Sequence, residues 1–297
     1  MAYYAQPSAE SALVLRNSAE TLSVTFYSGT TAADVSTGSV TIGIVDEAGN
    51  TVVSSGTAVT AVGSGVYTYS LASQSDLKRL IATWTGTWGS AMTFDTYHEV
   101  VGNFLTTPNE VRALDGISGE TSAYPNSAIV EAIEYAESII TDYCGASFVQ
   151  RYHRDVLNGT DTESIKLSKM FPQKLLSASV DGTALTAAEL SDVALFDDGF
   201  ITRGEGLWTF TDPGNQVIIE FEHGASSNAP ADIRWAAKVI AKWHLQEQLS
   251  RLPDNAISVQ SEVGQIQLSQ PGMNRPTPLP AVNTVLNRHR HRAPSAF

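Results

Sequence analysis

The clearest acid–base pair in the sequence is His244 and Glu247. They are three residues apart, which places them on adjacent turns of a helix, where an imidazole and a carboxylate could transfer protons. A single histidine that follows Trp243 on a helix is more often packed or interfacial than catalytic. We therefore interpret His244 as a packing residue.

Two groups of carboxylates are each open to two interpretations. Asp197 and Asp198 could bind a cation, but Asp-Asp-Gly is also an ordinary hairpin turn. Glu220 and Glu222 could act as a carboxylate pair, but alternation places both on one face of a strand. We expect a turn and a solvated strand face at these positions.

The motifs of metal and cofactor sites are missing from the sequence. None of the six histidines is spaced from another as helical metal ligands are, and Cys144 is the only cysteine. There is no phosphate-binding glycine loop, dinucleotide-binding turn, zinc-protease helix or nucleophile elbow. We expect a protein without catalytic residues, metal or cofactor, which is not an enzyme and which resides in a reducing compartment.

The densest cluster of charge lies near the C-terminus and consists of Arg288, His289, Arg290, His291 and Arg292. Such a cluster could dock on an acidic surface or contact DNA phosphates, or it could be an unstructured basic tail. Prolines precede it from Pro271 onward, and Pro-rich backbone cannot pack a core by itself. We favour docking on a partner.

Composition favours an acidic, globular protein of two domains. The 297 residues are 42% hydrophobic and 16% charged, with a formal net charge of −13. This charge argues against a protein that coats duplex DNA, but suits solubility or an acidic wall past which DNA slides. We also expect neither a secretion signal nor a membrane span, because no basic and apolar leader and no run of about eighteen apolar residues occurs.

Residues 1–104 have the composition of an all-β domain. Ser, Thr, Gly and Val dominate, and apolar residues alternate with polar ones in short segments. Turns at Gly49, Gly63 and Gly65 supply the positive φ that hairpins need. These features predict an immunoglobulin-like β-sandwich. Its predicted strands begin at Leu13, Leu22, Val40, Val66, Leu80 and Met92.

Two helices are predicted after residue 106. Thr107-Pro-Asn-Glu110 is a capping box with proline at the first helical position, which predicts a short helix. Residues 127–143 are predicted to form the next helix, which Gly145 ends. The apolar stripe of this second helix contains Ile129, Ile133, Ala136, Ile140 and Tyr143.

Residues 146–223 return to β signals and predict a small sheet, and a long helix is predicted over 230–252. Pro230 and Asp232 suit the start of this helix, and Pro253 ends it. Its apolar residues cover more than one side, so we expect it to pack against its own domain and a neighbouring subunit. The candidate interface residues are Ile233, Trp235, Val239 and Trp243.

The expected fold class is therefore α+β multidomain. An all-β immunoglobulin-like sandwich over 1–104 precedes a mainly helical domain with a small β-sheet insertion over 105–270. An extended, Pro- and Arg-rich tail over 271–297 follows, in which a short helix could form between Pro280 and Pro294.

Residues 107–118 (Thr-Pro-Asn-Glu-Val-Arg-Ala-Leu-Asp-Gly-Ile-Ser) and the following segment 128–145 resemble the opening of the head-to-tail connector (adaptor) proteins of long-tailed bacteriophages. The later order is also similar: a small β insertion, a long helix beginning with proline, a polar β segment over 258–268 and a C-terminal tail. This resemblance covers about residues 105–297. The front domain is similar to immunoglobulin-like modules appended to adaptors in some phages of actinobacteria, through the segments that begin at Gly65, Ala82 and Thr96.

The resemblance implies a structural virion protein at the head–tail interface, present in the host cytoplasm during assembly. It implies a dodecameric ring docked under the portal protein. The C-terminal tail of each subunit, which contains residues 288–292, would bind the portal. A stopper or tail-terminator protein would follow, and genomic DNA would pass through the lumen without sequence-specific binding or any membrane contact. Ring closure requires a heterologous interface, which suits a helix that is apolar on more than one side.

A binding module is the main alternative to the adaptor. In that alternative the Ser- and Thr-rich sandwich recognises a host-surface glycan, and the second domain anchors it in the particle. The aromatic residues proposed for this are Trp84, Trp88, Tyr67 and Tyr69. Trp84 and Trp88 are four residues apart in a predicted strand, so they point to one side, and core packing explains one of them more easily than both. A particle-associated hydrolase is the weakest alternative, because no convergent acid–base groups are evident.

Overall fold

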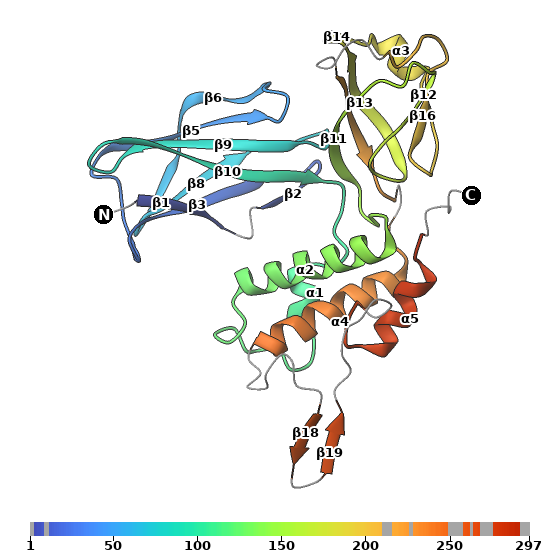
Figure 1. Cartoon of the computed structure of the whole chain (residues 1–297). Helices are drawn as coiled ribbons and strands as arrows, with labels where there is room; N and C mark the ends of the chain where they lie inside the picture. The colour runs from blue at the N-terminus through green and yellow to red at the C-terminus, as the bar shows by residue number, and fades with distance from the viewer. Residues whose placement is uncertain are drawn as a thin grey trace.

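The computed structural model describes residues 3–8, 12–209, 216–225, 228–248, 258–261, 264–267 and 276–291. A β-sandwich, two smaller sheets and a layer of helices are arranged around one junction (Figure 1). Strands contain 41% of the described residues and helices 22%. The prediction of a mainly helical domain after the sandwich was therefore wrong.

The sandwich consists of two packed sheets. The first has the order β1 (Tyr3–Pro7), β3 (Glu20–Ser28), β8 (Val66–Leu71) and β7 (Thr60–Gly63), with β4 (Thr31–Ala32) paired to β3. The second has the order β2 (Leu13–Leu15), β10 (Ala91–Val101), β9 (Arg79–Thr87), β5 (Thr37–Asp46) and β6 (Thr51–Ala58). Only β2 and β10 pair in parallel among these strands.

The sandwich core follows from the alternation read in the sequence. Leu22, Val24 and Phe26 of β3 are buried, and the residues between them lie on the outer face. Each such side chain contributes about 1.5–3 kcal/mol to folding. Gly65 has a φ of +76°, and a Cβ there would lie 2.7 Å from the carbonyl oxygen of Phe26, so the turn needs glycine.

Residues 151–223 form two sheets rather than the predicted small insertion. One has the order β11 (Arg151–Leu157), β17 (Val217–His223), β13 (Pro172–Val180) and β14 (Thr183–Ala184). The other has the order β12 (Ser164–Lys166), β16 (Phe200–Thr202) and β15 (Ala194–Leu195), and the short α3 (Ala187–Ser191) lies nearby. Strand β13 escaped prediction because two register shifts interrupt its alternation.

The helical layer contains α1 (Pro108–Arg112), α2 (Asn126–Cys144), α4 (Ala231–Gln248) and α5 (Pro280–Arg288). The capping box at Thr107 and the left-handed Gly145 after α2 (φ 75°) are confirmed. The predicted stripe of α2 is buried against α4, apart from Tyr143, which is partly buried. No helix in the described part of the chain is long and apolar enough to cross a membrane.

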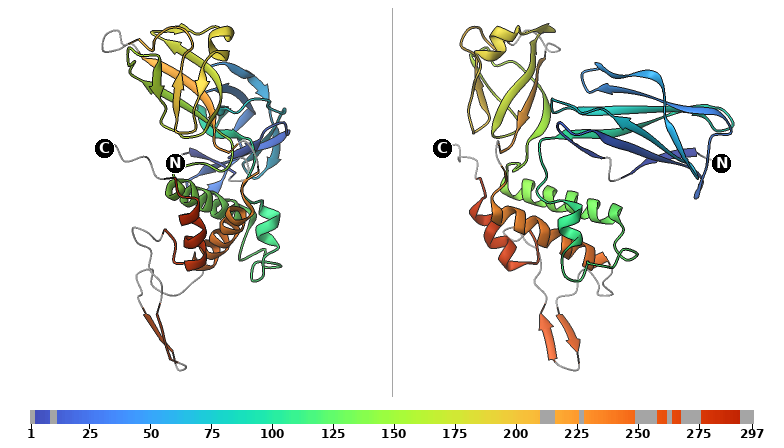
Figure 2. Two further views of the ribbon diagram at one scale, coloured as in Figure 1. Left: turned by 90° about the vertical axis from the view of Figure 1, so that its right-hand side faces the viewer. Right: turned by 180° about the vertical axis from the view of Figure 1, so that it is seen from behind.

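Helix α5 corrects the expectation of an extended tail. Its Val282 and Leu286 are fully buried in the same core as α2 and α4. Between α4 and α5 the hairpin of β18 (Ser258–Ser261) and β19 (Gly264–Gln267) projects away from the helices (Figure 2). Helix α5 is thus an integral element of the helical layer.

Candidate functional site

The basic cluster near the C-terminus lies against the helical layer. At the end of α5, Arg288 Nη1 lies 3.4 Å and His289 Nε2 lies 2.9 Å from Oδ2 of Asp232 at the start of α4. The hydrogen bond to His289 holds the pKa of Asp232 below its usual range. One carboxylate therefore binds two members of the predicted docking cluster.

The next two residues of the cluster contact the end of α2. The Arg290 guanidinium lies 4.9 Å from the centre of the Tyr143 ring, and the backbone N–H of His291 donates to the carbonyl of Cys144 at 2.8 Å. The His291 ring packs edge-on against Phe171 at 4.8 Å. The structure thus brings residues 288–291 together on their own chain, whereas Arg292 lies outside the described residues.

The four predicted interface residues of α4 differ in exposure. Ile233 is fully buried in the helical core, and Val239 and Trp243 are partly buried against it. Trp235 is 42% exposed. Tyr135 of α2, which is also exposed, stacks on His244 with 4.1 Å between ring centres, and burial lowers the pKa of His244. His244 is therefore a packed residue of the α2–α4 contact, as the sequence indicated.

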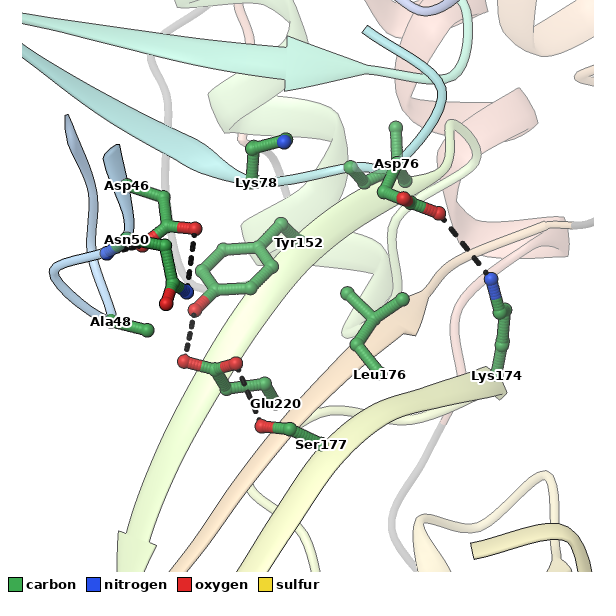
Figure 3. Close-up of a pocket in the computed structure, with 11 residues that line it drawn as sticks. Asp46, Ala48, Asn50, Asp76, Lys78, Tyr152, Lys174, Leu176, Ser177 and Glu220 are labelled. Carbon is green, nitrogen blue, oxygen red and sulfur yellow. Dashed lines mark hydrogen bonds and ion pairs between the residues drawn. The ribbon is translucent and has the colours of Figure 1, made fainter. Parts of the chain in front are cut away.

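A polar cavity of about 420 Å³ lies where the sandwich meets β11 and β13 (Figure 3). On its floor the Tyr152 hydroxyl donates to Glu220 at 3.0 Å, and the Ser177 hydroxyl donates to the other carboxylate oxygen at 2.7 Å. Burial, reinforced by the Glu220 charge, raises the pKa of Tyr152. Lys174 and Asp76 form an exposed ion pair at its rim. Glu220 is thus a hydrogen-bonded structural carboxylate rather than the solvated group expected.

Arg151 joins three parts of the molecule. From β11 its guanidinium reaches Glu99 of the sandwich at 3.1 Å and Glu137 of α2 at 2.5 Å. Glu137 is 4% exposed and also accepts the backbone N–H of Leu105. A second ion pair, between Arg16 and Glu222, links β17 to the residue that follows β2. Glu222 was expected on a solvated strand face, but it is 3% exposed and paired. Neither ion pair was predicted, because the partners lie on different elements.

The remaining candidate groups are structural in their contacts. Asp197 and Asp198 lie in the tight turn between β15 and β16, as predicted: Asp198 accepts the backbone N–H of Phe200. His223 is 6% exposed, and burial lowers its pKa to about 3. Within the described ranges no group of three or more His, Cys, Asp or Glu side chains is placed to hold a metal ion.

Both tryptophans of the proposed glycan site lie in the sandwich core. Trp84 is fully buried and donates its indole N–H to Thr96 at 2.9 Å. Trp88 is 2% exposed and packs against Phe26. Neither indole can stack on a sugar at the surface, so this reason for a glycan site is removed.

Comparison with known proteins gives a family match and several similar solved structures. The profile of the head completion protein family matches residues 104–291. Similar solved chains come from the virion of a native gene transfer agent (GTA) particle, with 17% identity, a TM-score of 0.44, and coverage of 65% of this chain and 97% of the other. A second comes from the neck of a native GTA particle computed with C12 symmetry, with 16% identity, a TM-score of 0.41, and coverage of 66% of this chain and 98% of the other. A third comes from the neck of an empty GTA particle computed with C6 symmetry, with 17% identity, a TM-score of 0.40, and coverage of 52% of this chain and 86% of the other. No curated protein matches the sequence.

The family match takes in more than half of the chain. It begins just before the capping box of α1, includes the small sheets and ends at His291, beyond α5. The chain therefore belongs to the head completion protein family.

Proposed function

We propose that the protein forms a ring, dodecameric by resemblance, that joins the portal to the tail and lets the genome pass. The family match over residues 104–291 is the observation that carries this proposal. The net charge of −13 supports it, because carboxylates around a lumen repel DNA phosphates and keep the DNA from binding. Portal on one side and a stopper or tail-terminator on the other are the proposed partners.

Within this ring, α4 supplies a subunit interface. Trp235 is a large apolar side chain exposed on a helix whose other side is already in the core. Exposed tryptophans at the centre of an interface commonly contribute about 2 kcal/mol or more to association. We assign Val239 and Trp243 to the margin of the same interface.

Residues 288–291 are the proposed contact with the portal. These two arginines and two histidines lie against α2 and α4, in a chain whose net charge is negative. The Arg288 side chain contacts Asp232 but is still 67% exposed. A cationic surface of this kind fits an acidic patch on a partner ring.

The front unit is proposed to be an immunoglobulin-like domain. Sheets of order β1-β3-β8-β7 and β2-β10-β9-β5-β6, with β2 parallel to β10, correspond to the strand order of such sandwiches. The two indoles that suggested a glycan site are buried, so no observation at those positions favours the alternative.

Light scattering and negative-stain imaging of the purified chain, alone and with a purified portal ring, test the proposal. We expect a ring in at least one condition. Trp235→Ala should raise the concentration needed for the ring at least ten-fold, whereas Leu207→Ala, which removes a similarly exposed side chain from the sheet region, should not. Charge reversal at Arg288 and Arg290 should weaken portal binding only. A persistent monomer that ignores the portal would refute the function.

A further inference from the structure

The surface of the sandwich is almost free of charge. Between residues 21 and 98 the charged side chains are Asp34, Asp46, Glu47, Asp76, Lys78, Arg79 and Asp95. Five of these lie at the junction, where they line its cavities or pair with each other. Asp34 accepts the N–H of Gly65, and Asp95 accepts the hydroxyl of Thr83. Among residues 21–98, therefore, the charged side chains away from the junction are two hydrogen-bonded carboxylates, and Glu20 of β3 and Glu99 of β10 lie just outside this range.

One outer face of the sandwich is a flat array of hydroxyl groups around one tyrosine. Strand register aligns Tyr97 with Ile81 and Val45, Asp95 with Thr83 and Gly43, and Thr93 with Thr85 and Thr41. Their neighbours in sequence point into the core, so these nine residues share the outer face. Tyr97 is 69% exposed. We call this set the threonine face.

The other sheet has an outer face of similar character. Tyr4 and Tyr27 stack with 5.1 Å between ring centres, and Thr25 and Thr68 lie on the same side of neighbouring strands. Val62 at the edge is 65% exposed. This second set, the tyrosine face, is on the opposite side of the sandwich because the two sheets pack core to core.

We propose that the threonine face of one copy packs against the tyrosine face of the sandwich in the next copy. This inference rests on the proposed ring. Copies that each carry a charge of −13 repel one another, so they can approach most closely through neutral surfaces. Interface centres are depleted of charge and enriched in tyrosine. Each face carries at least one tyrosine, and the one charged member of the threonine face is Asp95, which accepts the hydroxyl of Thr83. Two different faces on opposite sides are what a ring contact of one patch with another requires.

The area of the threonine face is adequate for a share of this contact. Three strands about 4.8 Å apart, over about six residues of 3.3 Å each, give about 290 Å². A stable interface needs about 800 Å² from each partner. The sandwich would therefore supply about a third of the contact, and α4 would supply much of the rest.

Cysteine cross-linking of the full-length chain tests the pairing. Cys144 is fully buried and burial raises its pKa to about 11, so it does not react and introduced cysteines are labelled selectively. We expect Thr68→Cys/Thr85→Cys, treated with a short bis-maleimide, to give a ladder of covalent oligomers. Each single variant should remain monomeric on a denaturing gel, because neither face meets itself.

A charge on the face provides a second readout. Thr85→Lys together with Thr93→Lys should raise the concentration needed for the ring at least ten-fold, whereas Ser90→Lys in the exposed turn beyond the face should not. A ring that forms without the ladder would overturn this inference and leave the ring function intact. Dimers from Thr85→Cys alone would overturn it too, and absence of both ring and ladder would refute both proposals.

A glycan as the occupant would give a different pattern. The wild-type chain would then be retarded on an immobilised neutral glucan, Tyr97→Ala would elute freely, Tyr4→Ala on the opposite face would still be retarded, and no ladder would form. That result would overturn the pairing of copies.

Discussion

Replacement of Arg151 by alanine should loosen the junction at which the sandwich, sheet and helices meet. The change leaves Glu137, which is 4% exposed, without its cation, and leaves Glu99 unpaired at its partly exposed position. Removal of one partner from a buried ion pair costs about 3–5 kcal/mol. Because Arg151 and Glu99 side chains are each 20% exposed, solvent screens part of this loss, and we expect about 3 kcal/mol.

Urea unfolding followed by circular dichroism at 222 nm measures this loss in the helical layer. With a slope of about 1–3 kcal/mol per molar urea, the midpoint should fall by about 1–3 M. Lys174→Ala is the matched control, because it removes a pair whose side chains are 57% and 54% exposed, and it should cost less than about 1 kcal/mol.

The second mutation of the cycle is Glu137→Gln. In the Arg151→Ala background it should recover about half of the lost stability, since a neutral amide no longer leaves a buried charge unpaired. Losses that simply add, or an Arg151→Ala variant within about 1 kcal/mol of the wild type, would refute the view that this guanidinium neutralises a buried carboxylate.

Four further outcomes are expected. Burial holds His223 neutral, so its contribution to the free energy of unfolding is complete above pH 6.5 and is lost as the pH falls toward 3. Between pH 7 and pH 5 the wild type should therefore lose about 2 kcal/mol more of its unfolding free energy than His223→Gln, measured by urea unfolding. Trp208→Ala removes a fully buried indole and should cost about 3–5 kcal/mol, measured by thermal unfolding, whereas the same change at exposed Trp235 should leave the monomer's melting temperature nearly unchanged. Thr107→Ala removes the side-chain cap of α1 and should cost about 1 kcal/mol by urea unfolding. The variant keeps the Thr107 backbone N–H, whose hydrogen bond is the main cause of the lowered pKa of Glu110, so this cost should stay nearly the same above and below pH 4.5, and a cost that changes strongly with pH would contradict this. Tyr143→Leu removes the ring under Arg290 and should increase tryptic cleavage after Arg288 and Arg290 about two- to five-fold, with Tyr143→Phe, which keeps the ring, closer to the wild type.

Local signals predicted the helices well. The capping box and the four-three spacing of isoleucines each act within one or two turns, so α1, α2 and the start of α4 could be read directly from the sequence. The same holds for the sandwich strands that alternate regularly, such as β5 and β9.

The errors arose where distant residues decide the structure. Strand β13 has two register shifts in its pairing with β17, and α5 is a short helix whose buried apolar residues, Val282 and Leu286, pack in the core with α2 and α4. Asp232 lies 57 residues from His289, and Glu99 lies 52 residues from Arg151, so neither contact leaves a periodic signal. Periodicity therefore identified the elements but not the charge pairs that fix their relative positions.

The position of α5 has a consequence for synthesis of the protein. Helices α1 and α2 leave the ribosome long before α5, yet the hydrophobic core that they share with α4 includes Val282 and Leu286 of α5, and Leu286 lies 142 residues after Cys144. During translation this core stays open until α5 has emerged. A chain that stops before α5 would expose the apolar surface that α5 covers, which is a target for chaperones and proteases. Incorporation into a particle would thus favour subunits that include α5, without any separate inspection step.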